Sequence, residues 1–219
     1  DISTPRLVDM LHSEEPLTRL KVMHVLVRRS DSAAVELLMR VAKTDPVADV
    51  RGSALEVLGA LGDDRAVPVY FSALSRGGLE GRMAEIAFRK VRDEAAWKQL
   101  LEIYLTDSNP VARQGALVVL ETISSFGMRP FCRRLGSLKL SESSVLFHLV
   151  ERLKVVSKDS LIDLVSDDDA EVRLGAMMLL SKFPTPKAAS ILAEQLVSSS
   201  SAHRLVAVTA LAGAPSLEA

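Results

Sequence analysis

The sequence predicts an all-α protein, a right-handed α-solenoid of about seven helix–turn–helix repeats. Three observations lead to this prediction. Hydrophobic residues make up 48% of the 219 residues but aromatic residues only 4%, so small and aliphatic side chains, which favour helices, must form the core. An apolar pair and an arginine each recur about every 31 residues. Around both, apolar residues lie three or four positions apart, which is the period of an amphipathic helix.

The apolar pair marks the first helix of each expected repeat, and the arginine marks the second. The pairs begin at Leu7, Leu37, Tyr70, Leu100, Phe131, Leu161 and Ile191. The arginines are Arg19, Arg51, Arg82, Arg113, Arg173 and Arg204, with Ser144 at the one position that lacks arginine. The expected repeats therefore span 1–30, 31–62, 63–92, 93–126, 127–156, 157–184 and 185–213.

Helix starts and ends fit these boundaries. Asp45-Pro46, Asn109-Pro110 and the run 167–169 of three aspartates stand before second helices, where short polar side chains cap free N–H groups. Gly62 and Gly127 are expected at helix ends. Because stacked pairs share one continuous core, we expect a single solenoid over residues 1–219, which could be a fragment of a longer chain. The apolar face of the last helix predicts that the chain continues or that this end pairs with something.

The segment 49–63, DVRGSALEVLGALGD, closely resembles the short HEAT repeat of the phycobilin-lyase type. Segments 111–117 and 169–176 are similar, and the resemblance covers essentially the whole chain. In that family an aspartate before the second helix and the arginine within it form a ladder between repeats. The resemblance therefore implies a structural ladder role for Asp49 with Arg51, and the same role for Arg113 and Arg173. Repeats three and five depart from the pattern, which indicates a shifted register or a bend there.

Net charge argues against one class of function, non-specific nucleic-acid binding, and the cysteine content indicates the cellular compartment. Lys and Arg number 27 and Asp and Glu 28, giving a net charge of −1, so the chain lacks the positive field of non-specific nucleic-acid binding. No apolar run approaches the roughly 18 residues that cross a bilayer. The single cysteine forms no intrachain disulfide and fits a reducing compartment, so we expect a cytoplasmic protein.

No arrangement of residues predicts catalysis. Cys132 replaces an apolar residue of the periodic pair, which favours a buried thiol over a nucleophile. Of His12, His24, His148 and His203, no two lie within a helical turn and none precedes a glutamate, unlike the di-iron site of HEAT-repeat hydroxylases. We therefore expect no catalytic residue, metal or cofactor, and not an enzyme.

Two groups of basic residues have a structural and a functional interpretation. The fixed spacing of the arginine ladder favours joints between repeats over a phosphate-binding stripe. A second group gathers around repeats three to five. It consists of Arg89, Lys90, Arg92, Arg129, Arg133, Arg134, Lys139, Arg152, Lys154 and Lys158. This group is either a solvated face or a local patch for an acidic protein surface or phosphates.

We therefore expect a non-enzymatic scaffold, adaptor or regulatory domain that holds another protein, with its oligomeric state open. By resemblance, second helices line the concave binding face. Expected partner-binding residues are His24, Arg28, Glu56, Arg89, Glu121 and Arg152. Two alternatives stay open: a phycobilin-lyase-like protein that handles a tetrapyrrole, and a HEAT-like DNA-binding protein, which the balanced charge disfavours.

Overall fold

A computed structural model describes residues 2–29, 34–121, 125–138, 149, 152, 158–182 and 185–212 of the protein. Within this described part the chain forms helices and no strand, which confirms the all-α repeat class. The helices fall into two compact units, Asp1–Leu120 and Glu121–Ala219. The expectation of one continuous array over residues 1–219 stays a prediction.

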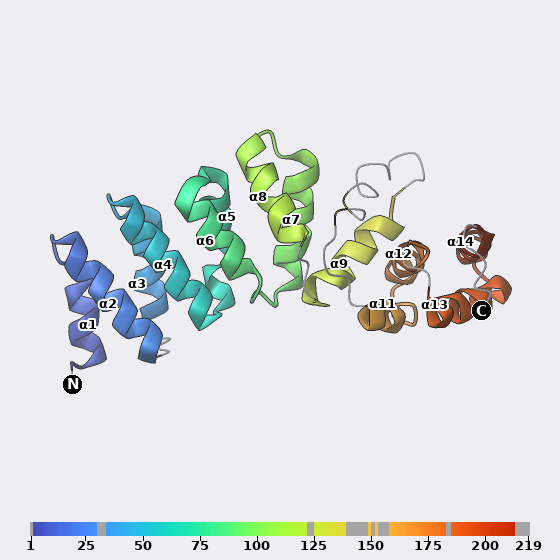
Figure 1. The fold of residues 1–219 in the computed structure, drawn as a ribbon, viewed down its shortest axis with the longest axis horizontal. Coiled ribbons are helices and arrows are strands. Elements are labelled where there is room, and N and C mark those ends of the chain that lie inside the picture. The colour runs from blue at the N-terminus through green and yellow to red at the C-terminus, as the bar shows by residue number, and fades with distance from the viewer. Residues whose placement is uncertain are drawn as a thin grey trace. The chain divides into compact units, whose positions relative to one another are not determined.

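Unit 1 contains four successive helix pairs. Their helices are α1 (Thr4–Met10), α2 (Pro16–Arg29), α3 (Val35–Thr44), α4 (Ala48–Leu61), α5 (Val67–Arg76), α6 (Gly78–Phe88), α7 (Glu94–Thr106) and α8 (Pro110–Leu120), with a 3-10 turn, η2 (Asp64–Ala66), before α5. The pairs lie side by side in chain order, from the blue α1 and α2 to the yellow-green α7 and α8 (Figure 1). The second helices α2, α4, α6 and α8 pack on one another in succession. They form one continuous row.

Unit 2 contains the remaining described helices. They are α9 (Ser125–Gly136), α11 (Lys158–Leu164), α12 (Ala170–Leu180), α13 (Pro186–Glu194), a 3-10 turn η4 (Gln195–Val197) and α14 (Ser201–Ala212). Helix α12 is central, since it packs against α9, α11 and α14. Ser144, His148, Lys139 and Lys154 lie outside the described residues, as does the side chain of Lys158.

The periodic apolar pairs point into the core, as their spacing predicts. At least one member of each pair is 3% exposed or less: Leu7, Leu38, Tyr70, Leu100, Phe131, Leu161 and Leu192. The second helices contribute the other half of the core through residues such as Ala54, Leu55 and Leu58, which are all fully buried. Each helix pair therefore buries its apolar faces against the neighbouring pairs.

The expected caps are mostly present. Gly62 ends α4 in the left-handed conformation with φ 66°, where glycine avoids the strain of a side chain. Asp169 caps α12 by accepting from the N–H groups of Glu171 and Val172. The expectation for Gly127 is wrong, because this residue lies in the first turn of α9 rather than at a helix end.

Two glycines let the backbones of α9 and α12 touch. A Cβ atom on Gly136 would lie 1.9 Å from the carbonyl oxygen of Glu171, and one on Gly175 would lie 1.9 Å from that of Cys132. No other residue fits at either position without moving a helix. This crossing fixes the distance over which the side chains of α9 reach α12.

Candidate functional site

The arginine of the second helix first closes the turn inside its own repeat. In four repeats its Nη1 donates, at 2.7 Å, to the carbonyl oxygen six residues earlier; the arginines are Arg19, Arg51, Arg173 and Arg204. Those carbonyls belong to the turn that joins the two helices of the pair, where helical partners are lacking. The spacing of six residues is therefore the reason that the arginine recurs with the repeat.

In unit 1 the same arginines also reach the next repeat. Arg19 Nη2 donates to Asp45 Oδ1 at 2.9 Å, and its Nε lies 2.7 Å from Oδ2 without hydrogen-bond geometry. Both side chains are buried. Arg51 Nε donates to Glu80 Oε1 at 2.9 Å. Burial acts to raise the pKa of Glu80, but hydrogen bonds from Arg51 and Arg76 outweigh it and lower that pKa.

The ladder uses a different aspartate from the one that the resemblance implied. Asp45 stands six residues before Arg51, accepts from Arg19 and also accepts from the N–H of Val47 at 2.9 Å. It thus joins two repeats and shapes the turn before α4. Asp49, the expected member, is exposed in the first turn of α4, and Arg51 pairs with Glu80 instead.

Arg82 and Arg113 do not occupy ladder contacts in the described residues. Both side chains are exposed, and neither forms a hydrogen bond or ion pair there. In repeat three the turn residue is Gly77, with φ 69°, so Met83 rather than Arg82 follows it by six positions. In repeat three Arg76, on the first helix, makes the contact with the neighbouring repeat instead. It pairs with Glu80 and donates to the carbonyl oxygen of Ala42 at 3.2 Å. Repeat three therefore has the shifted register that its sequence indicates.

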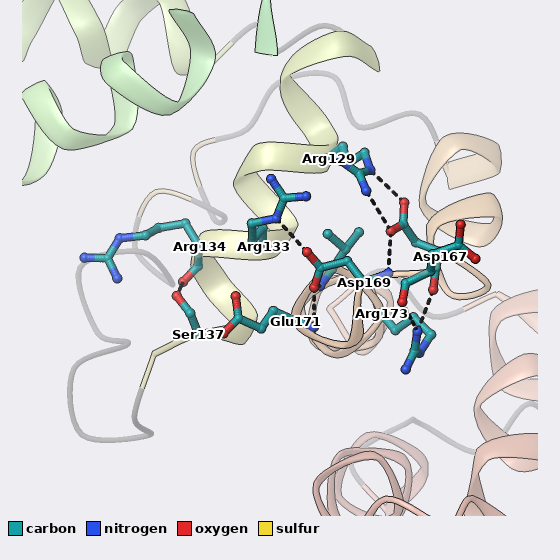
Figure 2. A network of polar contacts seen from close by, with 10 residues as sticks. Arg129, Arg133, Arg134, Ser137, Asp167, Asp169, Glu171 and Arg173 are labelled. Carbon is teal, nitrogen blue, oxygen red and sulfur yellow. Dashed lines mark hydrogen bonds and ion pairs between the residues drawn. The ribbon is translucent and has the colours of Figure 1, made fainter. Parts of the chain in front are cut away.

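In unit 2 the first helix of one repeat supplies the arginines (Figure 2). Arg129 on α9 donates to both carboxylate oxygens of Asp167, at 2.8 and 3.1 Å. Arg133, one turn later, donates to Asp169 at 2.8 Å. Hydrogen bonds from these arginines lower the pKa of Asp167 and of Asp169. Sequence reasoning placed Arg129 and Arg133 in a basic patch, yet the structure pairs both with carboxylates.

The six expected partner-binding residues divide into two groups. His24, Arg28 and Glu56 are exposed on second helices of unit 1, and Arg89 is exposed directly after α6. Glu121 is only 5% exposed, which contradicts its expected exposure. Its carboxylate accepts from Arg152 Nε at 2.8 Å, so these two residues pair with each other. Glu121 follows α8 by one residue, and its burial depends on an arginine 31 positions away, which no local pattern reveals.

A groove of about 310 Å³ lies between α4 and α6 on the row of second helices. Its apolar lining consists of Leu55, Gly59, Ala60, Met83, Ile86 and Ala87, and its charged lining of Glu56 and Lys90. The groove therefore borders one expected partner-binding position, Glu56. Sequence reasoning missed Met83 and Ile86, although apolar residues three apart on a polar helix face were a usable signal.

A second hollow, of about 400 Å³, lies between α5 and α7 on the layer of first helices. Its charged lining includes Arg65, whose guanidinium already pairs with Asp63 and reaches Glu36. Arg65 is thus already engaged with carboxylates of the chain itself. The hollow between α4 and α6 is the better candidate for a binding site.

The remaining chemically reactive groups have structural surroundings. Cys132 is fully buried, as expected, and burial raises the pKa of its thiol. Among the described residues no group of three or more His, Cys, Asp or Glu side chains could hold a metal ion. No helix in the described part is long and apolar enough to cross a membrane.

Helix pairs that pack in succession define the class of α-helical repeat proteins. Residues 4–77, about a third of the chain, match the family of HEAT repeats. No curated protein matches the chain at a significant level.

Several solved structures are similar at low identity. The phycocyanin lyase complex of CpcE and CpcF from Nostoc sp. PCC7120 matches at 18% identity, with 96% of this chain and 87% of that chain covered and a TM-score of 0.44. A HEAT-like repeats protein from Thermococcus onnurineus NA1 matches at 17% identity, with 97% of each chain covered and a TM-score of 0.39. Mini spindles TOG3 from Drosophila melanogaster matches at 12% identity, with 98% and 97% covered and a TM-score of 0.41. At these scores the likenesses carry no argument about function.

Proposed function

We propose that this protein is a non-enzymatic scaffold that holds a partner protein on the second helices of unit 1. The observation behind the proposal is the groove between α4 and α6, with a half-exposed isoleucine, Ile86, on its wall. The side chains of Arg82 on α6 and of Arg89, which directly follows α6, form no hydrogen bond or ion pair among the described residues. An apolar hollow with adjacent uncommitted cations is a common feature of protein-binding surfaces.

The ionisable groups elsewhere support a binding role over catalysis. Four arginine–carboxylate pairs are engaged in contacts that join helices: Arg19 with Asp45, Arg51 with Glu80, Arg129 with Asp167 and Arg133 with Asp169. Catalytic acids and bases instead need a free position beside a substrate. We propose that the partner contacts His24, Arg28, Glu56 and Arg89, because they are exposed on successive second helices or, for Arg89, at the end of one.

Affinity capture from a native lysate tests this function, with and without nuclease and read by mass spectrometry. The baits are the wild-type chain, Arg89→Glu and a matched control, Arg40→Glu, which makes the same charge change on the exposed side of a first helix, α3. We expect a defined protein on wild type and Arg40→Glu, with recovery on Arg89→Glu reduced about fivefold or more.

Three other outcomes would contradict the proposal. Equal recovery on Arg89→Glu would show that the partner uses another face. Recovery that disappears with nuclease would indicate a nucleic-acid partner, despite the net charge of −1. A shift in the absorbance of an added bilin would favour the chromophore-handling alternative.

A further inference from the structure

The groove between α4 and α6 has a floor of small residues. A Cβ atom added to Gly59 would lie 2.8 Å from the Cβ of Ala87, so the two helices touch at this point. Ala60 is exposed beside this contact, while the larger side chains of Leu55, Met83 and Ile86 form the walls. The floor is thus shallow, apolar and rigid, which suits an inserted apolar side chain.

Ile86 is one of the exposed large apolar residues of unit 1. It is 54% exposed, and Leu17 and Val111 are similarly exposed at 59% and 45%. Single exposed apolar residues are ordinary on protein surfaces. Ile86, however, also lines a groove with five other apolar residues.

The α6 side of the groove is positively charged. Arg82, Ile86 and Arg89 are spaced by four and three residues and therefore follow one face of the helix. Lys90 extends across the groove, where its Nζ donates to the carbonyl of Ala60 at 3.3 Å. Against these three cations stand two carboxylates, Glu56 on the opposite wall and the partly buried Glu85.

Glu85 does little to satisfy the arginines. Burial raises the pKa of its carboxyl group, and the charges of Arg82 and Arg89 oppose that rise without reversing it. Neither arginine forms an ion pair with it within hydrogen-bonding distance. Both guanidinium groups are available to a carboxylate from outside the chain.

We infer that this groove binds a peptide segment of the partner that places one large apolar side chain beside Met83 and Ile86 and acidic side chains on Arg82 and Arg89. The inference rests on the scaffold function proposed above and names the chemistry of the segment. A volume of about 310 Å³ is at the lower limit for small-molecule sites. This volume is sufficient for one anchoring side chain. A few such buried side chains supply most of the binding energy of a protein interface.

A random-peptide phage library, selected on the immobilised full chain, tests the inference. Enriched peptides are synthesised with a fluorescent label and titrated by anisotropy against wild type, Ile86→Gln, Arg89→Glu and the control Arg40→Glu. We expect enriched sequences to combine Leu, Ile, Met or Phe with nearby Asp or Glu. Ile86→Gln and Arg89→Glu should each weaken binding about tenfold, and Arg40→Glu should leave it unchanged within about twofold. Circular dichroism of each variant verifies that its helices remain.

A charge exchange separates a direct contact from a general loss of fold. A peptide with its acidic residues replaced by lysine should bind Arg89→Glu more tightly than it binds wild type. Peptides that bind equally to wild type, Ile86→Gln and Arg89→Glu would overturn the inference but leave the scaffold function standing, since they would mark another surface. Enrichment of basic peptides, or of none, would also overturn it, while capture from lysate decides the scaffold function independently.

Discussion

Arg19 and Arg51 each connect three parts of the chain with one guanidinium group. Nη1 closes the turn inside the repeat, and the other nitrogens reach a carboxylate of the following repeat. A guanidinium group has five N–H donors in a planar fork, so one side chain can satisfy both sets of acceptors. Lysine has the charge but not this geometry, and arginine is therefore the residue that suits the joint.

The structure predicts that Asp45, and not Asp49, is the acidic residue of the first joint. Asp45→Ala would leave the buried guanidinium of Arg19 without its carboxylate and should reduce the free energy of unfolding by about 3–5 kcal/mol. Asp49→Ala removes an exposed carboxylate from the first turn of α4 and should cost less than about 1 kcal/mol. Urea unfolding followed by circular dichroism compares the two; equal losses would contradict this assignment.

Sequence reasoning located the arginines of the ladder better than their partners. Arg19, Arg51, Arg173 and Arg204 follow from a fixed spacing, because each contacts a carbonyl six residues earlier in its own chain segment. The carboxylate partners of arginines lie much further away in the sequence. Asp45 is 26 residues from Arg19, and Asp167 is 38 residues from Arg129. Such partners depend on how helices pack, and no local pattern specifies them.

His203 makes the stability of unit 2 depend on pH. Burial lowers the pKa of its imidazole from the ordinary 6.5, and a hydrogen bond with the backbone of Ala170 only partly opposes this effect. The unfolded chain thus binds a proton more readily, so stability is complete above about pH 6.5 and decreases as the pH falls below it. In His203→Gln the urea midpoint of unfolding should change less between about pH 7 and pH 5 than it does in wild type. A wild-type midpoint that rises on acidification would contradict the assignment.

At the scale of helices, the contact between α4 and α6 depends on a residue without a side chain. A Cβ on Gly59 would meet Ala87 at 2.8 Å from its Cβ and 3.0 Å from its Cα, and backbone cannot yield as a flexible side chain does. Gly81, inside α6, has only one neighbour near its added Cβ, the carbonyl oxygen of Ala73 at an ordinary 3.6 Å. These two helical glycines therefore have opposite expected effects.

Gly59→Ala should destabilise the protein by about 1–3 kcal/mol, because the overpacked contact outweighs the gain in helix propensity. Gly81→Ala should stabilise it by about 0.5–1 kcal/mol, since the same gain meets no clash. The midpoints of urea unfolding give both values. A stabilising Gly59→Ala would show that α4 and α6 can separate without loss, and the rigid floor of the groove would then be in doubt.

Helix positions were more predictable than the register of repeat three. The boundaries of the first four repeats agree with the observed pairs because apolar periodicity and caps such as Asn109-Pro110 act locally. Repeat three is an exception, since Gly77 and Gly78, both with positive φ, make a different turn between α5 and α6. The glycines could have signalled the change, but the arginine spacing alone placed Arg82 in the ladder.

At the scale of the whole molecule, stability comes from contacts between successive helix pairs. In unit 1 each second helix packs on the next, and in unit 2 α12 packs on α9, α11 and α14. Repeat proteins of this kind gain stability as a sum of repeat and neighbour terms, so a local defect need not unfold distant repeats. Because the chain has two compact units, we expect a defect in one unit to leave the other folded.

Leu55→Asp places a charge in the fully buried core of unit 1 and should cost several kcal/mol, because no buried cation is available to pair with it among the neighbours that line its groove. Hydrogen exchange read by mass spectrometry should show lost protection in α3 to α6, while the amides of α12 keep theirs. Loss of protection in both units at once would show that the chain unfolds as one cooperative body. Unchanged protection in α4 would mean that Leu55 does not contribute to the core.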